Sequence, residues 1–357
     1  MASQAGVAAA GRMSWVQSPA FDLAFFILAP LVALPIIGAS LRGIGTATLL
    51  AFVLAFSHYM STFTFFFWDE NRPRHRARRL AFVGGPVVIV VVFWGLVAFR
   101  VPLVIQFLLF FWNTYHVALQ SCGIASIYRH RAGVADPRQK GVVNAAIISA
   151  NVWFALWNIE THQEVLPVLA ALSPLLPGAL KAVGGAVTLV FLVRLAKALQ
   201  RRAAEGRGPT GPELGAVVTG VALFHPYLWV RTSEAATFAM LIPHYIQYLG
   251  IVWLLHRRKF REPQGSRGQI VLQHLSANTP TLVLALVAVG LGFLGAKHLF
   301  GRIGQAQNFE ALYLLLAFVH FYLDGIFWAF KDPHVRRSIG PYLTSAPPLP
   351  LVPVGAR

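Results

Sequence analysis

The sequence predicts an all-α integral membrane protein, a polytopic bundle of about ten transmembrane helices with both termini in the cytoplasm. Composition supports this fold class, because 56% of the 357 residues are hydrophobic and only 12% are charged. A soluble domain carries about 25% charged residues. Cys122 is the one cysteine of the chain, so no intrachain disulfide framework can hold the fold. These features exclude disordered, collagen-like and disulfide-scaffold proteins.

Long apolar stretches define the individual spans, because a helix needs about 20 mostly apolar residues to cross a bilayer. Residues 1–19 are interpreted as an N-terminal cytoplasmic segment, residues 20–330 as a single transmembrane domain, and residues 331–357 as a Pro-rich cytoplasmic tail. The ten predicted spans are 20–41, 45–68, 80–99, 102–128, 142–158, 180–200, 214–230, 233–256, 279–300 and 308–330.

The distribution of basic residues predicts the orientation of the spans. The formal net charge is +17, but the basic residues form short clusters between apolar runs and no extended basic face, which excludes a nucleic-acid partner. Cytoplasmic loops are enriched in Lys and Arg, and such clusters follow the even-numbered spans. We therefore expect a multi-pass protein of the cell inner (cytoplasmic) membrane, with the lipid bilayer as partner. The clusters lie at 72–79, 129–140, 194–207 and 257–267.

Five histidines lie deep inside predicted spans, each about ten to twelve residues from the predicted cytoplasmic end. At a rise of about 1.5 Å per residue, all five imidazoles would lie roughly 15–18 Å from the inner surface, near the bilayer midplane. Ionisable groups inside a membrane are costly and mark functional sites by default. The five are His58, His116, His225, His244 and His320.

Three of these histidines precede a polar residue on the same helix face, because residues three or four apart are neighbours on a helix. A carboxylate or carboxamide there could ligate a metal or orient a ligating imidazole. Asn113 and Tyr245 add hydrogen-bonding capacity at a similar depth. The pairs are His116 with Gln120, His244 with Gln247, and His320 with Asp324.

Neutral imidazole is a normal ligand of iron, copper and zinc. Together with Asp324, the histidines approach the two-His-one-carboxylate or all-His iron sites of non-haem oxygenases. Motifs for nucleotide hydrolysis, serine hydrolysis, zincin proteolysis and covalent haem attachment do not occur in the sequence.

The chain resembles the Brp/Blh family of membrane carotenoid-cleaving oxygenases. The resemblance rests on about ten spans, on single histidines at positions 58, 116, 244 and 320, and on the late H-x-x-x-D pattern in HFYLD (320–324). It implies an all-helical fold and histidine-bound iron that splits β-carotene to retinal. His225 departs from the family pattern, which leaves the substrate open.

The leading hypothesis is a histidine-rich, non-haem iron oxidoreductase that uses O₂ on a hydrophobic small-molecule substrate dissolved in the bilayer. His58, His116, His244 and His320 are the predicted metal ligands. Asp324 is expected to be a ligand or an anchor for one, and His225 a fifth ligand or a proton shuttle. The predicted orienting residues are Gln120, Gln247, Asn113 and Tyr245.

Two alternatives use the same histidines. In the first, pairs of histidines are axial ligands of haem b in an electron-transfer or gas-handling protein. In the second, the histidines relay protons in a proton-coupled transporter, which predicts no stoichiometric metal.

Overall fold

The structure is a computed structural model, and it describes residues 15–41, 46–134, 136–157, 159, 166–230, 232–260 and 265–344. Within these ranges the chain forms helices and no strand, which agrees with the predicted all-α class. Prolines begin many of the helices, where their missing N–H groups leave no hydrogen bond unmade. Helices with proline in the first turn include α2, α6, α7, α10, α11, α12, α15 and α17.

The first half of the chain supplies the N-terminal bend and three helices that reach the centre of the molecule. The segments Pro19–Ile27 and Ala29–Ile36 are bent by 59° relative to each other. The elements are α2 (Pro19–Asp22), η1 (Leu23–Ile27), η2 (Ala29–Val32), α3 (Ala33–Leu41), α4 (Thr46–Phe63), η3 (Thr64–Phe67), α5 (Asn71–Ala77), η4 (Leu80–Gly84), α6 (Gly85–Ala98), α7 (Pro102–Arg131) and α8 (Pro137–Trp157).

The second half contains the longest peripheral helices and the central helix. Pro226 follows a break in the seventh predicted span, which is divided between two helices. The elements are α9 (Leu166–Leu172), α10 (Leu176–Ala204), α11 (Gly211–Ala222), α12 (Pro226–Trp229), α13 (Ser233–Lys259), α14 (Arg267–Ala277), α15 (Thr279–Arg302), α16 (Ala306–Phe327), α17 (Pro333–Ser338) and α18 (Gly340–Thr344).

Among the described residues, six helices are long and apolar enough to cross a membrane, or seven if the bent N-terminal pair is one span. Each of the ten predicted ranges coincides with helical structure. However, α4, α8 and α11 are not among these six helices, and Val53–Phe67, within the second predicted span, is a shorter apolar helix. The chain therefore has the helices of a multi-pass membrane protein, and the count of ten remains a prediction. The six are Leu80–Ala98, Pro102–Arg131, Leu176–Ala204, Ala235–Lys259, Pro280–Arg302 and Ala306–Phe327.

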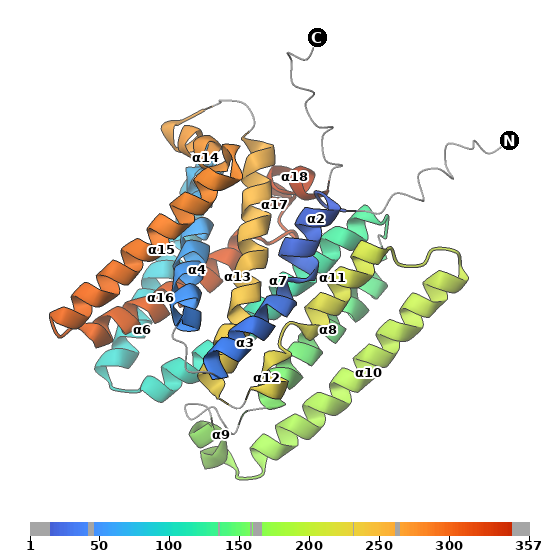
Figure 1. Cartoon of the computed structure of the whole chain (residues 1–357), viewed down its shortest axis with the longest axis horizontal. Helices are drawn as coiled ribbons and strands as arrows, with labels where there is room; N and C mark the ends of the chain where they lie inside the picture. Colours follow the sequence, from blue (N-terminus) through green and yellow to red (C-terminus); the bar gives the residue numbers. More distant parts are fainter. Residues whose placement is uncertain are drawn as a thin grey trace.

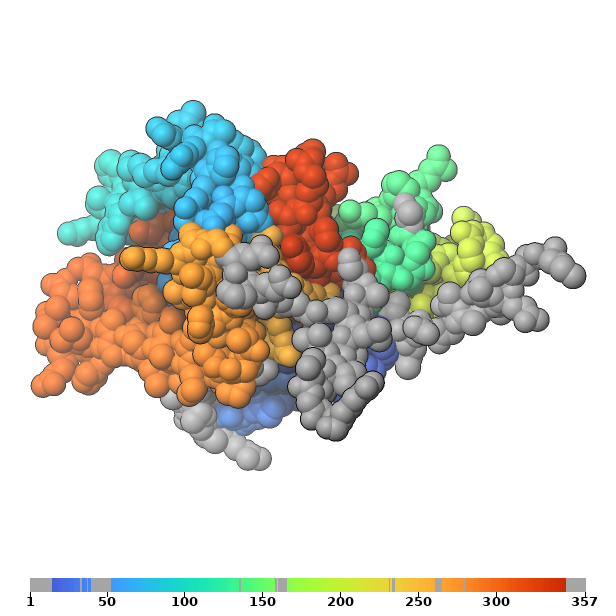
Figure 2. All heavy atoms as spheres, turned by 90° about the horizontal axis from the view of Figure 1, so that it is seen from above, coloured from blue at the N-terminus to red at the C-terminus, as the bar shows by residue number. Residues whose placement is uncertain are grey.

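Helix α13 runs through the middle of the bundle, and α10 and α15 lie on opposite sides of it (Figures 1 and 2). In the most apolar stretch of α13, 83% of the residues are buried, against 11% in α10 and 6% in α15. A helix that is apolar all round is a lipid-facing or a fully buried element. The low burial of α10 and α15 fits helices that face lipid, whereas α13 is enclosed by protein.

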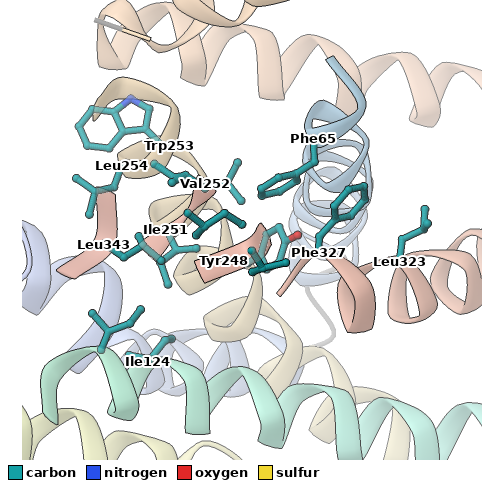
Figure 3. Close-up of a cluster of buried hydrophobic side chains, with 14 of the residues drawn as sticks. Phe65, Ile124, Tyr248, Ile251, Val252, Trp253, Leu254, Leu323, Phe327 and Leu343 are labelled. Atoms are coloured by element: carbon teal, nitrogen blue, oxygen red, sulfur yellow. The ribbon is translucent and has the colours of Figure 1, made fainter. Parts of the chain in front are cut away.

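A large aromatic and aliphatic cluster surrounds one half of α13. Figure 3 shows Tyr248 in this cluster near Phe65 and Phe327. The Phe65 and Phe327 rings are stacked at 5.1 Å between centroids, and Trp253 stacks on Phe21 at 5.2 Å. The first contact joins η3, directly after α4, to α16, and the second joins α13 to α2.

Helix α4 is also fixed from its other side, by α15. A Cβ atom added to Gly290 would lie 2.5 Å from Val53 Cγ1 and 2.8 Å from Val53 Cα. The Ser57 hydroxyl donates to the Leu286 carbonyl at 2.8 Å. Only glycine permits such a close approach of the two backbones.

Several basic helix ends meet at one end of the bundle. Arg258 at the end of α13 donates to the Tyr342 carbonyl at 2.6 Å, and Arg131 at the end of α7 donates to the Thr344 carbonyl at 3.1 Å. Arg74 of α5 pairs with Asp332, just beyond α16, at 2.7 Å. The ends of the second, fourth, eighth and tenth predicted spans therefore lie together, as a parallel arrangement of the even-numbered spans requires.

Candidate metal centre

Four helices each bring one histidine to a common point inside the bundle. His58 lies on α4, His116 on α7, His244 on α13 and His320 on α16. Their exposed fractions are 0%, 9%, 1% and 0%, and Asp324, one turn after His320, is 5% exposed. Buried polar groups are costly unless they are hydrogen-bonded or bind an ion, so this group of five side chains needs an explanation.

The four imidazoles contact one another directly. The centroid of the His58 ring lies 4.3 Å from that of His320 and 4.8 Å from that of His244. The His116 ring lies 5.1 Å from His320 and 5.4 Å from His244. The interplanar angles of these pairs are between 66° and 85°, so the rings meet edge to face and their nitrogens can converge.

His58, His116 and His320 have ligand nitrogens that all lie within 4.8 Å of one another, so they could hold a metal ion. Around a tetrahedral ion at about 2.1 Å from each ligand, the ligand atoms are about 3.4 Å apart. Asp324 Oδ2 is close to this spacing, at 3.6 Å from His320 Nε2 and 4.0 Å from His116 Nε2. Asp324 lies outside the group of three, so its side chain would have to move inward to complete a three-nitrogen, one-oxygen site.

Unpaired nitrogen atoms support the same interpretation. Both ring nitrogens of His58 and the Nε2 atoms of His116 and His320 are buried and have no hydrogen-bond partner among the described residues. More than 90% of buried polar groups in proteins are hydrogen-bonded. Several unpaired lone pairs at one point are what a metal ion would satisfy, since imidazole binds metals in its neutral form.

His244 lies beside this trio but outside it. Its ring packs on His58 and His116, and its Nδ1 atom is also buried without a partner among the residues described. However, the nitrogens that fall within reach of a single ion are those of His58, His116 and His320. His244 is thus a neighbour of the candidate site and a ligand only if the ring moves.

A hydrogen-bond network anchors one side of the centre. The Thr62 hydroxyl lies 2.8 Å from His320 Nδ1 and donates to Asp324 Oδ1 at 2.9 Å. The Tyr248 hydroxyl donates to the same Asp324 oxygen at 2.7 Å and accepts from Trp328 Nε1 at 3.2 Å. Asp324 Oδ1 is therefore occupied by two donors, and Oδ2 faces the histidines.

Gln120 and Gln247 were predicted to orient the rings, but their side-chain hydrogen bonds in the described structure go to backbone carbonyls and to each other. Gln120 Nε2 donates to the His244 backbone carbonyl at 3.0 Å. Gln247 Nε2 donates to the Phe26 carbonyl at 3.0 Å. Both amides thus hold backbone segments together, and they position α13 against α7 and the N-terminal bend.

Of the other predicted site residues, Tyr245 lies near the centre and His225 lies apart from it. The Tyr245 ring is 4.9 Å from the His58 ring. Asn113 is half-buried on α7. His225 precedes α12, where its Nδ1 atom lies 3.2 Å from the Ala222 carbonyl, and no described ring contact joins it to the four central histidines.

Asn151 explains the surroundings of His225. Its Nδ2 atom donates to the Gly220 carbonyl at 2.9 Å, and its Oδ1 atom accepts from the Phe224 amide at 3.3 Å. Asn151 therefore bridges the break between α11 and α12, where Pro226 lacks an N–H group.

The shape of the centre favours a single ion over a haem group. The rings of His58, His116 and His320 pack against one another, and Phe321 covers His116 at 4.5 Å between centroids. A porphyrin between two axial histidines would require a flat slot that separates these rings. The described side chains leave no such slot between the imidazoles.

The sequence analysis missed Thr62 and Tyr248. A signal for both was present, because Thr62 follows His58 by four residues and Tyr248 follows His244 by four residues. Residues at this spacing share a helix face, so helical spacing alone could have placed both hydroxyls on the face that carries a histidine.

No protein-family model matches the chain, and no curated protein or solved structure does either.

Proposed function

We propose that this chain is a membrane-embedded metalloprotein whose centre holds a transition-metal ion between His58, His116, His320 and Asp324. The observation that carries the proposal is the convergence of three buried imidazoles that each have an unpaired ring nitrogen, two of which also lie within 4.0 Å of one carboxylate oxygen. The residues come from three different helices, so ordinary helix-to-helix hydrogen bonding gives no reason for their nitrogens to face one another unpaired.

We further propose that the ion is non-haem iron and that the protein is an oxidoreductase that uses O₂. Imidazole and carboxylate ligands with open positions are typical of non-haem iron oxygenases. Cys122 does not belong to the site, because its thiol donates to the Asn144 carbonyl at 3.8 Å, away from the histidines. A bound iron ion would supply redox and Lewis-acid chemistry that no side chain of the centre provides.

The substrate is proposed to be a small molecule that dissolves in the bilayer. Aromatic side chains enclose the centre, with Phe321 on His116 and Trp112 next to Phe321 at 6.1 Å between centroids. An apolar enclosure excludes water from the reacting groups. A lipid-soluble substrate would reach such a centre laterally, from the membrane between helices.

We propose that the basic end of the bundle faces the cytoplasm and that the membrane is the inner cell membrane. Arg258, Arg131 and Arg74 at this end come from separate helices, and clustered basic residues favour the cytoplasmic side. Ten spans would then place both chain termini on that side.

Metal analysis of detergent-purified protein tests the proposal. We expect about one iron per chain in the wild type and less than a tenth of that in His320→Ala or His116→Ala. His274→Ala is the control, because His274 is exposed and its Nδ1 atom lies 2.7 Å from the carbonyl of Ile270. It should retain the metal.

Addition of nitric oxide to anaerobic ferrous protein tests the redox role, because nitric oxide occupies an open iron position where O₂ would bind. We expect the electron paramagnetic resonance signal of a ferrous nitrosyl complex in the wild type and in His274→Ala only. Stoichiometric zinc without this signal would reject the iron proposal, and equal metal loss from all three variants would reject the site. A Soret absorption band would show bound haem b and would reject the non-haem iron proposal.

A further inference from the structure

We infer that Thr62 and Tyr248 are positioning residues of the metal centre, with Thr62 selecting the tautomer of His320 and both hydroxyls aiming Asp324 at the ion. The inference rests on the proposed function, since it assigns these hydroxyls to the same centre. Neither hydroxyl touches the convergence point of the three ligand nitrogens, so each would act through a ligand.

The tautomer of His320 follows from the proton of Thr62. The Thr62 hydroxyl has one proton, and its oxygen lies 2.9 Å from Asp324 Oδ1 and 2.7 Å from the Tyr248 hydroxyl. We assign the proton to the bond to Asp324, so the Thr62 oxygen accepts in its contact of 2.8 Å with His320 Nδ1. A neutral imidazole has one N–H group, so His320 carries its proton on Nδ1 and presents the Nε2 lone pair. Nε2 is the nitrogen that lies 3.6 Å from Asp324 Oδ2 and has no partner among the described residues.

The orientation of Asp324 follows from its two donors. Thr62 and Tyr248 both donate to Oδ1, which satisfies that oxygen and fixes the plane of the carboxylate. Oδ2 then points toward His116 and His320. Partners that fix the orientation of a ligand in this way raise metal affinity by about 10- to 100-fold.

A third group supports the arrangement from behind. Trp328 Nε1 donates to the Tyr248 hydroxyl at 3.2 Å, so the Tyr248 oxygen has an acceptor role toward Trp328 and a donor role toward Asp324. The Tyr248 ring also packs on His58 at 4.2 Å between centroids. Tyr248 thereby contacts three of the four proposed ligand residues, Asp324 through its hydroxyl and His58 and His320 through its ring.

Cobalt(II) titration of metal-free, detergent-purified protein tests the inference, because the visible bands of Co²⁺ report both binding and ligand geometry. We expect Thr62→Val to weaken Co²⁺ binding by about 10- to 100-fold and to shift the bands, and Thr62→Ser to restore both. Tyr248→Phe should weaken Co²⁺ binding by about 10-fold. This variant tests the inference if Thr62→Val does not fold.

Thr114→Val is the matched control. Thr114 is also buried on a helix, but its hydroxyl donates to the Phe110 carbonyl of its own helix at 2.7 Å. The control should bind Co²⁺ like the wild type, with unchanged bands.

The outcomes separate this inference from the proposed function. If the wild type binds Co²⁺, His320→Ala does not, and both Thr62→Val and Tyr248→Phe retain wild-type affinity and bands, the positioning roles are overturned and the centre stands. If the wild type itself binds no Co²⁺, both the centre and the positioning roles are overturned. If Thr62→Val and Thr114→Val lose affinity equally, the effect is one of helix packing and the inference is wrong.

Discussion

Replacement of Asp324 by asparagine should weaken metal binding and stabilise the metal-free protein at the same time. Thr62 and Tyr248 both donate to Asp324 Oδ1. In Asp324→Asn the amide oxygen must take the Oδ1 position, because an amide NH₂ there would meet two donors. The NH₂ group then takes the Oδ2 position and points toward the Nε2 atoms of His116 and His320.

The two effects have different magnitudes. Removal of one partner from a buried charge pair costs about 3–5 kcal/mol, which corresponds to roughly two to three and a half orders of magnitude in metal affinity. In the metal-free protein, by contrast, the NH₂ group is 3.6–4.0 Å from two unpaired nitrogens. A small movement gives hydrogen bonds to lone pairs whose lack of a partner costs about 1–3 kcal/mol.

Two measurements on the same preparations check this prediction. Co²⁺ titration gives the change in metal affinity, and thermal unfolding in the presence of a chelator, followed by tryptophan fluorescence, gives the change in stability of the metal-free state. Wild-type affinity in Asp324→Asn would refute the assignment of Oδ2 to the ion. A lower melting temperature of the metal-free variant would refute the deduced amide orientation.

Three further predictions concern other parts of the molecule. His225→Ala should retain wild-type metal content, and a loss of metal measured by elemental analysis would contradict the position of His225 outside the centre. Gly290→Val should destabilise the protein by at least about 1–3 kcal/mol, because the backbone of Val53 cannot move away from the new side chain; an unchanged thermal unfolding curve would show that α15 and α4 are not in backbone contact. Burial lowers the pKa of His75, in α5, to about 4. The unfolded chain therefore binds more protons than the folded protein between about pH 6.5 and 4, and stability should decrease as the pH is lowered through this window. His75→Phe should reduce that dependence of the melting temperature on pH, and an identical dependence would show that other groups cause it.

The sequence predicted the helical class, and a similar depth within the predicted spans singled out five histidines, four of which lie together in the structure. It did not determine how each helix is rotated about its own axis. His225 illustrates the difference, since it shares the predicted depth of His58 and His320 but lies at the break before α12. Rotation depends on packing against neighbours, for example the approach of α15 to α4 at Gly290.

The roles of individual polar residues were also less predictable than their presence. Gln120 and Gln247 lie one turn from histidines, as Thr62 and Tyr248 do, but the amides bond to backbone carbonyls and the hydroxyls bond to the centre. Helical spacing places a side chain on a face, and only the neighbouring helices decide which group it reaches. The sequence therefore restricted the candidates without distinguishing among them.

The wide separation of the converging residues along the chain has a consequence for assembly during synthesis. Thr62 lies 258 residues before His320 and 262 residues before Asp324, and both partners belong to α16, the last long helix. When α4 and α7 have been inserted but α16 has not yet been synthesised, His58 and His116 lack Asp324, the carboxylate of the candidate site. Under the proposed function, ion capture would therefore be a late maturation event, and synthesis that stops before α16 would leave a helical intermediate without two of the four proposed ligands.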